Sequence, residues 1–521
     1  MAIIIDTNFP GGGADKVYIG ANGTITFSAP VDGSLTDRSL WFYFCVRGAK
    51  GKALCFIQQG MTHTLEPFYA GTYAAVRPVV REGPGGAFYR IPSSDTSFKA
   101  DPISYTFTLT PKSDETYVAF CFPYQYADLL RFVETHSKDI SLRMIGKTEE
   151  GRDYPVLLIG DDGNPKKKLI ITTARQHSGE SPGSFVLEGF LEQYLSENES
   201  GKYLRETSVL LVLPMTNLDG VEEGRYGKDA PPADFNRAWM TESIREELRS
   251  FLKLVDELLK IYKPGLYVDF HAPQPGGYSY VVLPRASVLG KEGWKRINLL
   301  VDLYEDLTRD RGSCRRQDLD REYINWGRDN YRLTATHLFS ECYHIDAFSF
   351  ESSYNTDCFG RYLSPEDWHF MGRQLCTAVG KIWFEAYDSP GVITSTTELL
   401  WDGWEMVSIP KNTMVTAKPK MFRAEALGDG ASIFFADLHR FKSDEKGSYT
   451  LLCDNETQII CYVHYGKGDK IAVKSRPYYL CTEKGSVRIP FSLFVKEAYD
   501  FFQVAFNITS LKGSFSISHT G

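Results

Sequence analysis

The stretch ITTARQHSGESPGSF, residues 171–185, decides how the middle of the chain folds. A strand-like run ends at Thr173, and a helical pattern of small and apolar residues begins after Glu180. His177 and Glu180 therefore lie three residues apart, where a strand gives way to a helix. Two interpretations are open at this point: a polar loop with a capping glutamate, or half of a metal site.

Apolar runs of the same character recur through the middle of the chain and alternate with longer helical patterns. The runs occupy residues 169–173, 209–214 and 266–271. The best helical pattern covers residues 243–262, where Ser243 and Glu246 fit a capping box and Pro264 stops the helix. Alternation of this kind predicts a sheet covered by helices on both faces.

The two ends of the chain have a different pattern. Short alternating runs separated by Gly, Pro, Asp and Ser clusters fill residues 1–125, and similar short runs fill residues 391–521. We therefore predict an α/β domain at residues 126–390, flanked by an N-terminal and a C-terminal all-β sandwich domain.

Composition narrows the class of protein. With 521 residues, 43% hydrophobic and 24% charged, the chain has the composition of a soluble globular protein of several domains. Its net charge of −8 without a basic stripe argues against nucleic-acid binding. No apolar run reaches the roughly 18 residues of a membrane span. The N-terminus has no signal-peptide pattern and the ten cysteines form no CxxC, so we expect reduced thiols and a cytoplasmic protein.

A third metal ligand is expected from a neighbouring strand, because ligands gather at the carboxyl ends of strands in such sheets. The run LYVDFHAPQPGG, residues 266–277, supplies His271 at a strand end before a Pro/Gly loop. Catalytic Zn²⁺ needs about three protein ligands and a position open to water, and two histidines with one glutamate can supply the ligands. His177, Glu180 and His271 are the candidate ligands.

Two further motifs carry functional groups. The stretch VLPMTNLDGVEEGRYGKDAPPADFNRAW, residues 212–239, brings Asn236 and Arg237 together, and such a pair suits the binding of a carboxylate. The stretch AFSFESSYN, residues 347–355, places Glu351 inside an apolar strand, where burial is costly without a function. Beside a metal-bound water, Glu351 would be a general base.

In this order, these motifs resemble the zinc metallocarboxypeptidases. Three N-terminal stretches resemble the β domain that precedes the catalytic domain in cytosolic carboxypeptidases, and the resemblance covers approximately residues 1–385. They are WFYFCVRG (41–48), GGAFYRI (85–91) and YVAFCFPYQYADL (117–129). The resemblance implies a mixed sheet, bound Zn²⁺, and removal of the C-terminal residue from peptide or protein tails.

The resemblance also implies a role for each matching residue. His177, Glu180 and His271 would bind zinc. Glu351 would activate the zinc-bound water and pass its proton to the leaving amine. Asn236 and Arg237 would hold the terminal carboxylate of the substrate.

The chain departs from the family pattern at several positions. Where the family has an arginine that stabilises the oxyanion, the count reaches Gly227 or Lys228, so Arg225 is the first candidate and Lys228 the second. Where glutamate-trimming members have a basic residue before the catalytic glutamate, this chain has Asp346 nearby, which would favour basic or amide side chains in the substrate. The candidates for the family's substrate-capping tyrosine are Tyr323, Tyr331, Tyr343 and Tyr354.

Two alternatives stay open from the sequence. One is a zinc amidase acting on N-acyl amino acids or cell-wall stem peptides with the same ligands. The other is a non-catalytic peptide- or glycan-binding protein that keeps the fold. The sequence does not predict the oligomeric state or the role of the C-terminal β domain.

Overall fold

The computed structural model describes most of the chain, and its packing divides into two compact units. The first unit contains the N-terminal β region and most of the middle of the chain; the second contains the C-terminal β region, β16 and part of α7. The description covers residues 2–520 except 33–39, 61–72, 101–102, 229, 241–243, 275, 277–278, 283, 285, 309–333, 358, 385–399, 402–403, 409–412, 419–420, 427–430, 438, 443–445, 456, 468–469, 475–477, 483–484, 495–499 and 512–513.

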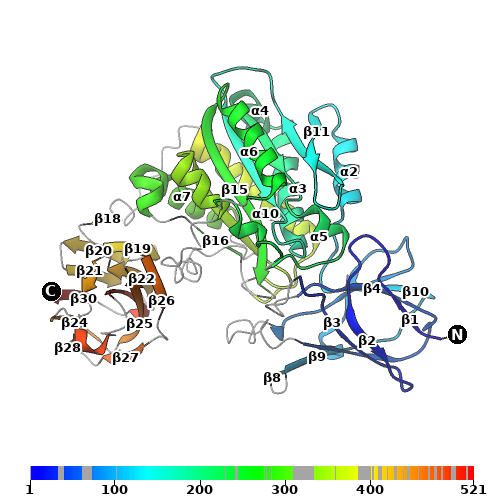
Figure 1. Cartoon of the computed structure of the whole chain (residues 1–521), viewed down its shortest axis with the longest axis horizontal. Helices are drawn as coiled ribbons and strands as arrows, with labels where there is room; N and C mark the ends of the chain where they lie inside the picture. Colours follow the sequence, from blue (N-terminus) through cyan, green and yellow to red (C-terminus); the bar gives the residue numbers. More distant parts are fainter. Residues whose placement is uncertain are drawn as a thin grey trace. The chain divides into compact units, whose positions relative to one another are not determined.

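A seven-stranded sheet forms the middle of the chain (Figure 1), in the order β11-β12-β14-β13-β15-β17-β16. Its strands are β11 (Ile140–Lys147), β12 (Asp153–Ile159), β13 (Lys168–Ala174), β14 (Ser208–Leu213), β15 (Lys263–Gln274), β16 (Tyr280–Val282) and β17 (Asp346–Ser353). β13 pairs in parallel with β14 and β15, whereas β12 pairs antiparallel with β11 and β14. The sheet is therefore mixed, as the sequence resemblance implied.

Helices cover this sheet. They are α2 (Tyr126–Thr135), α3 (Ser181–Leu195), α4 (Glu199–Thr207), α5 (Leu218–Glu222), α6 (Glu246–Leu259), α7 (Ala286–Thr308), α9 (Ala335–His337) and α10 (Pro365–Val379). Every residue of β14 is buried, and so are all but the first residues of β12 and β13. Burial of consecutive residues means that both faces of these strands are covered, which is why they are apolar without alternation.

α3 packs closely against α10, and glycine permits the approach. A Cβ atom on Gly189 of α3 would lie 2.1 Å from the carbonyl oxygen of His369, and one on Gly372 of α10 would lie 1.9 Å from that of Val186. Only residues without a side chain fit there. This contact fixes the axis of α3, whose first residue follows Glu180 directly.

The helix predicted at residues 243–262 is shorter in the structure. α6 begins at Glu246 with Arg245 as its N-cap, without a side-chain capping hydrogen bond, and Ser243 lies outside the described residues. The helix ends at Leu259, and Pro264 belongs to β15. The predicted end at residue 262 is wrong because the next strand already begins at Lys263, so Pro264 lies inside a strand and does not end the helix.

The N-terminal region consists of two five-stranded sheets whose aromatic side chains meet. One sheet has the order β1-β4-β10-β6-β7 and the other β2-β3-β5-β9-β8. Phe27 of the second sheet contacts Phe44 of the first sheet and Phe42 directly before its strand, with ring centroids 5.3 and 5.1 Å away. The strands are β1 (Ile4–Asp6), β2 (Asp15–Ile19), β3 (Thr24–Ser28), β4 (Tyr43–Arg47), β5 (Leu54–Gln59), β6 (Val79–Glu82), β7 (Tyr89–Arg90), β8 (Thr96–Ala100), β9 (Ile103–Leu109) and β10 (Glu115–Ala119).

Arg90 of β7 connects this region to the middle of the chain. Its guanidinium donates to the Tyr354 carbonyl and to Asn355 Oδ1, both at 2.7 Å, and to the Leu363 carbonyl at 3.1 Å. These acceptors belong to the segment that follows β17. A buried guanidinium is costly unless its donors are satisfied, so this contact ties the segment firmly to β7.

The C-terminal region also consists of two sheets. Their orders are β18-β19-β22-β29-β25-β26, with β23 and β27 paired to β29 and β25, and β20-β21-β30-β24-β28. The strands are β18 (Leu400–Trp401), β19 (Trp404–Ser408), β20 (Thr413–Lys418), β21 (Met421–Ala426), β22 (Ala431–Asp437), β23 (Phe441–Lys442), β24 (Ser448–Cys453), β25 (Thr457–Lys467), β26 (Lys470–Lys474), β27 (Tyr478–Thr482), β28 (Gly485–Pro490), β29 (Phe501–Leu511) and β30 (Ser514–Thr520).

Two other sequence expectations concern membranes and thiols. Among the described helices, none combines the length and the apolar character that crossing a bilayer requires. The cysteines whose state is described are free: Cys45, Cys55, Cys121, Cys342, Cys376, Cys453 and Cys461.

The carboxyl group of Glu188, on α3, lets us predict how stability depends on pH. Burial, together with Glu192, raises the pKa of Glu188 to about 7, although a hydrogen bond from Tyr124 opposes the shift. The folded state therefore holds this proton more tightly than the unfolded chain, and its contribution to stability is lost as pH rises from the unfolded pKa towards 7. We expect Glu188→Gln to raise the free energy of unfolding at pH 8 by roughly 2 kcal/mol and to have little effect at pH 4.5.

Chemical denaturation at the two pH values checks this expectation, with the exposed Glu197→Gln as the matched control. Equal effects of Glu188→Gln at pH 4.5 and pH 8 would contradict it.

Candidate metal centre and active site

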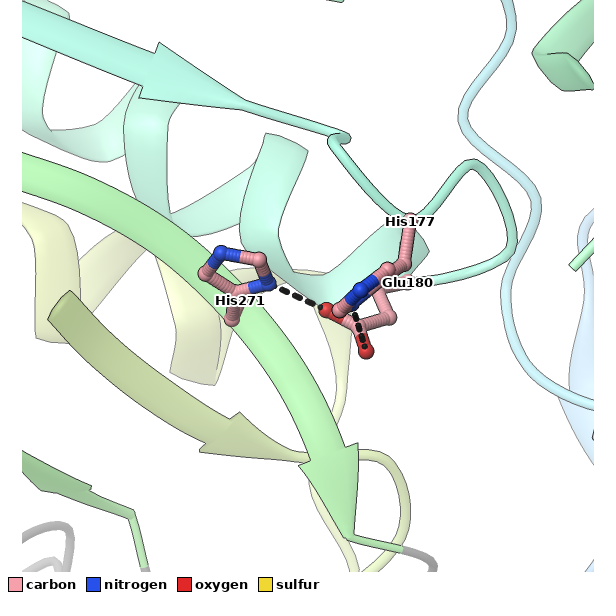
Figure 2. A group of neighbouring side chains, drawn as sticks. All are labelled: His177, Glu180 and His271. Carbon is pink, nitrogen blue, oxygen red and sulfur yellow. Dashed lines mark hydrogen bonds and ion pairs between the residues drawn. The ribbon is translucent and has the colours of Figure 1, made fainter. Parts of the chain in front are cut away.

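His177, Glu180 and His271 meet in the structure (Figure 2). His177 Nδ1 lies 2.9 Å from Glu180 Oε1, and His271 Nδ1 lies 2.9 Å from Glu180 Oε2. All three side chains are buried. Two imidazole nitrogens thus point at the two oxygens of one carboxylate, and their ligand atoms all lie within 4.8 Å of one another.

The three residues come from two neighbouring parallel strands. His177 and Glu180 lie between the end of β13 and the start of α3, and His271 lies on β15, which pairs with β13. The Ala272 N–H donates to Glu180 Oε2 at 2.9 Å and fixes the carboxylate beside β15. The strand-end argument from the sequence therefore explains how residues far apart in the chain come together.

Arg175 holds the turn that carries His177. Its backbone adopts a positive φ of 60°, and its buried guanidinium donates to the Ser178 carbonyl at 2.7 Å and the Tyr124 carbonyl at 2.9 Å. Burial lowers the pKa of Arg175 to about 10, so the side chain stays charged at neutral pH. Arginine is suited to this place because its fork reaches two carbonyl groups at once.

A second layer of carboxylates orients the histidines. His177 Nε2 lies 3.3 Å from Asp234 Oδ1, and His271 Nε2 lies 3.0 Å from Asp269 Oδ2. Asp269 in turn accepts hydrogen bonds from Thr173 and Gln176. A hydrogen-bond acceptor on the far nitrogen of a histidine fixes the ring of a metal ligand, and here it leaves Nδ1 to face a cation.

The charges of this cluster fit a divalent cation. Burial alone would lower the pKa of His271, but the carboxylates of Asp269 and Glu351 outweigh it and raise that pKa well above its usual value. Burial would raise the pKa of Glu180, but His177 and His271 hold it well below its usual range. The cluster thus retains positive charge next to Glu180, and a cation bound by the two Nδ1 atoms would replace these protons.

Glu351 lies on β17 beside the cluster. Its side chain is buried, and its charge contributes to the raised pKa of His271. The next residue, Ser352, donates a hydrogen bond to the His271 carbonyl at 3.0 Å, which connects the two strands at this level. The structure thus brings Glu351 next to the candidate metal ligands.

Asn236 and Arg237 form a short 3₁₀ turn, Phe235–Arg237. Asp234 caps this turn by accepting from the Asn236 N–H at 2.8 Å, and the same carboxylate contacts His177. Burial would raise the pKa of Asp234, but His177 and Arg237 outweigh it and hold that pKa far below its usual value. Asp234 thus connects the predicted carboxylate-binding pair to His177, one of the candidate metal ligands.

The two candidates for the oxyanion-stabilising cation lie in different places. Arg225 forms an ion pair with Glu223, and its side chain is 46% exposed. Lys228 Nζ lies 3.8 Å from Glu180 Oε1, inside the cluster. Gly227, between them, has a φ of +89°, and a Cβ there would lie 2.5 Å from the Ser178 nitrogen, so no side chain fits at that position. The geometry favours Lys228, the second candidate from the sequence.

Asp346 is placed differently from the sequence interpretation of a bare acidic pocket. It is the first residue of β17, and its carboxylate accepts from Arg296 Nε at 2.6 Å. Five residues of strand separate its Cα from that of Glu351 by roughly 16 Å. Arg296 thus offsets the negative charge of Asp346, and the selection of basic substrate side chains stays a prediction from the sequence.

The four candidates for the substrate-capping tyrosine lie in different places. Tyr354 is buried and donates to the Gly179 carbonyl at 3.1 Å, which makes it part of the frame of the site. Tyr343 contacts Phe339, with ring centroids 5.3 Å apart. Tyr323 and Tyr331 lie outside the described residues.

Sequence reasoning missed Asp234 and Asp269 as partners of the histidines. The signal was present, since each aspartate lies two residues from a residue already singled out, Asn236 and His271. The sequence also gives no sign of Asp32 in the N-terminal region, which accepts a hydrogen bond from the Gly227 N–H at 2.6 Å. No local pattern could reveal that contact, because about 195 residues separate the two groups.

Comparison with known proteins agrees with this geometry. Residues 125–256 match the family model for zinc carboxypeptidases, and they include His177, Glu180, Asn236 and Arg237. The chain contains a zinc carboxypeptidase domain. His271 and Glu351 lie beyond the matched segment, and in the structure His271 contacts Glu180 while the charge of Glu351 acts on His271.

The curated relatives include proteins named cytosolic carboxypeptidases. Cytosolic carboxypeptidase 2 of Xenopus tropicalis is 31% identical over 255 residues, which are 44% of this chain and 26% of that protein. Cytosolic carboxypeptidase 6 of Caenorhabditis elegans is 27% identical over 373 residues, which are 65% of this chain and 78% of that protein. The chain therefore spans about a quarter of the Xenopus relative and most of the Caenorhabditis one.

Solved structures agree on the fold. A metallo-carboxypeptidase from Burkholderia cenocepacia matches with a TM-score of 0.61 and 19% identity, over 73% of this chain and 98% of that one. One from Pseudomonas aeruginosa matches with a TM-score of 0.58 and 20% identity, over 72% and 98%. Nearly three quarters of the chain thus share the fold of these solved structures, in which a mixed sheet is combined with helices.

Asp234 and Asp269, which contact the far nitrogens of the two histidines, allow a prediction about zinc affinity. We expect Asp234→Asn and Asp269→Asn each to weaken zinc binding by roughly 10- to 100-fold, because the far nitrogen of each imidazole loses its charged partner. Competition against a chelator of known affinity measures the change. The exposed Asp153→Asn in the same domain is the control and should bind zinc as the wild type does. Unchanged affinity in both variants would refute the assigned role.

Proposed function

We propose that the protein is a zinc-dependent carboxypeptidase that hydrolyses the last peptide bond of peptide or protein tails. The observation that carries this proposal is the meeting of His177, Glu180 and His271 with Glu351 beside them, in a zinc carboxypeptidase domain. The relatives are named cytosolic carboxypeptidases, so we expect action in the cytoplasm on peptide tails.

The protein's own residues would hold the metal. His177 Nδ1, Glu180 and His271 Nδ1 form the ligand set, and the two outer aspartates fix the rings. When bound, Zn²⁺ lowers the pKa of a water molecule and polarises the scissile carbonyl. Burial of the ligands keeps competing water away and strengthens each electrostatic contact.

Glu351 is the proposed general base. Its carboxylate would take one proton from the attacking water, and the same proton would pass to the amine of the leaving residue as the C–N bond breaks. Asn236 and Arg237 would hold the free carboxylate of the substrate, since the pair presents a forked cation and an amide donor. Recognition of a free terminus makes the cleavage exopeptidic.

Lys228 is the proposed stabiliser of the oxyanion in place of the arginine of the family. Its ammonium already lies 3.8 Å from a ligand oxygen, so a carbonyl oxygen that enters the site would be near a positive charge as it develops negative charge. Lysine offers a point charge without the planar fork, and we therefore expect a weaker grip on the ground-state substrate.

Two other functions compete with this proposal. An amidase on N-acyl amino acids or cell-wall stem peptides would use the same ligands, and an inactive binding protein would keep the fold without turnover. The buried Glu351 next to the ligands argues against the second. No residue of the described site favours an acyl group other than a peptide.

The decisive experiment measures release of single amino acids from peptides that differ only in their last residue. We expect release by the zinc-loaded wild type, and a loss of roughly 10²- to 10⁴-fold in kcat for Glu351→Gln with zinc content unchanged, because only the proton transfer is removed. Release from blocked C-terminal amides at the same rate would contradict exopeptidase action. Turnover of cell-wall fragments alone would favour the amidase.

Lys228 is tested separately. We expect Lys228→Ala to lower kcat by roughly 10²- to 10³-fold at unchanged zinc content, because a charge at the developing oxyanion is lost. Lys228→Arg should restore part of the rate, and Arg225→Ala, with its charge already paired to Glu223, serves as the control. A larger loss in Arg225→Ala than in Lys228→Ala would reverse the assignment.

A further inference from the structure

A second group of side chains of the types that bind metal ions lies in the C-terminal β region. Asp437, His439 and His519 bring their ligand atoms within 4.8 Å of one another. Asp437 Oδ1 lies 2.6 Å from His439 Nδ1, and Asp437 Oδ2 lies 3.6 Å from His519 Nε2. We propose that Asp437, His439 and His519 form a second Zn²⁺ site, separate from the carboxypeptidase centre.

The first argument is the likeness to the carboxypeptidase centre of the same chain. The rings of His439 and His519 have centroids 4.6 Å apart and an interplanar angle of 61°. For His177 and His271 the values are 5.0 Å and 56°. In both clusters the two imidazoles approach the two oxygens of one buried carboxylate, and two histidines with one carboxylate are a common zinc ligand set.

The second argument is the charge of Asp437. Its side chain is fully buried, and within the described residues no lysine or arginine forms an ion pair with it. Its surroundings are aromatic, because the rings of Phe441, Tyr449 and Phe491 lie against one another beside His519. A carboxylate in such surroundings is costly without a cation, and a metal ion held with the histidines would compensate it.

The third argument is the support around the ligands. Asp437 ends β22 in one sheet, and His519 lies on β30 in the other, so a metal ion here would cross-link the two sheets. Tyr449 donates to Asp437 Oδ2 at 2.8 Å and would orient the carboxylate from outside the ligand shell. The His439 side chain is 36% exposed, which leaves a route for the ion from solvent.

In a third cluster of carboxylates and histidine, an arginine side chain balances the negative charge. Glu188, Glu192 and His369 also bring their ligand atoms within 4.8 Å of one another, but Arg373 forms an ion pair with Glu192 at 2.6 Å. An arginine of the protein thus supplies the positive charge there. Asp437 has no such partner among the described residues, and this difference selects the C-terminal cluster as the metal site.

Zinc stoichiometry of the full-length protein tests the proposal. Protein stripped with a chelator, reloaded with Zn²⁺ and freed of excess metal should contain about two zinc ions per chain. The variant His177→Ala/His271→Ala should retain about one, and addition of His439→Ala should remove it. His439→Ala alone should keep the carboxypeptidase zinc, and His136→Ala is the control for a histidine outside both clusters.

Two further measurements guard against misfolding. Because His439 is partly exposed, His439→Gln should fold, and circular dichroism of each variant verifies it. Co²⁺ loaded into His177→Ala/His271→Ala should give the visible absorption of a tetrahedral site, and His439→Gln should abolish it. If the folded double variant binds neither Zn²⁺ nor Co²⁺, Asp437 is held by hydrogen bonds alone and the proposal is wrong.

Discussion

The Glu180 carboxylate between two imidazoles is the contact on which the rest of the site depends. Each of its oxygens faces one Nδ1 atom at 2.9 Å, and the carboxylate is almost completely buried. Such a group persists in the interior only if positive charge stays beside it, from imidazole protons or from a metal ion. Three features hold these side chains together. They are the pairing of β13 with β15, the hydrogen bond from Arg175 to the Ser178 carbonyl, and the contacts of Asp234 and Asp269 with the histidines.

The N-terminal β region belongs to the frame of this site. Arg90 holds the segment after Glu351, and Asp32 holds the backbone of Gly227 next to Lys228. The Gly11 N–H also donates to the Glu222 carbonyl at 2.8 Å, close to the same loop. The segment that follows the strand of Glu351 and the loop that carries Lys228 thus depend on contacts from a region remote in sequence.

The sequence was sufficient to predict the candidate metal ligands, but not the side-chain pairings around them. His177, Glu180 and His271 could be predicted because strand ends in a parallel pair meet, and strand ends are visible as apolar runs. The choice between Arg225 and Lys228 could not, since it depends on the left-handed turn at Gly227 and on the Glu223 ion pair. The pairing of Asp346 with Arg296 could not be predicted either, because this side-chain contact joins a helix and a strand, and the spacing of residues in the sequence does not reveal it.

Anomalous X-ray scattering from crystals grown with zinc tests the central claim most directly. The account predicts a strong peak at the zinc edge bonded to His177 Nδ1, Glu180 and His271 Nδ1, at about 2.0–2.2 Å from each ligand atom. If the crystals show no peak there, and Glu180 keeps its direct hydrogen bonds to both imidazoles in the presence of zinc, these residues are a buried polar network and the proposed activity fails.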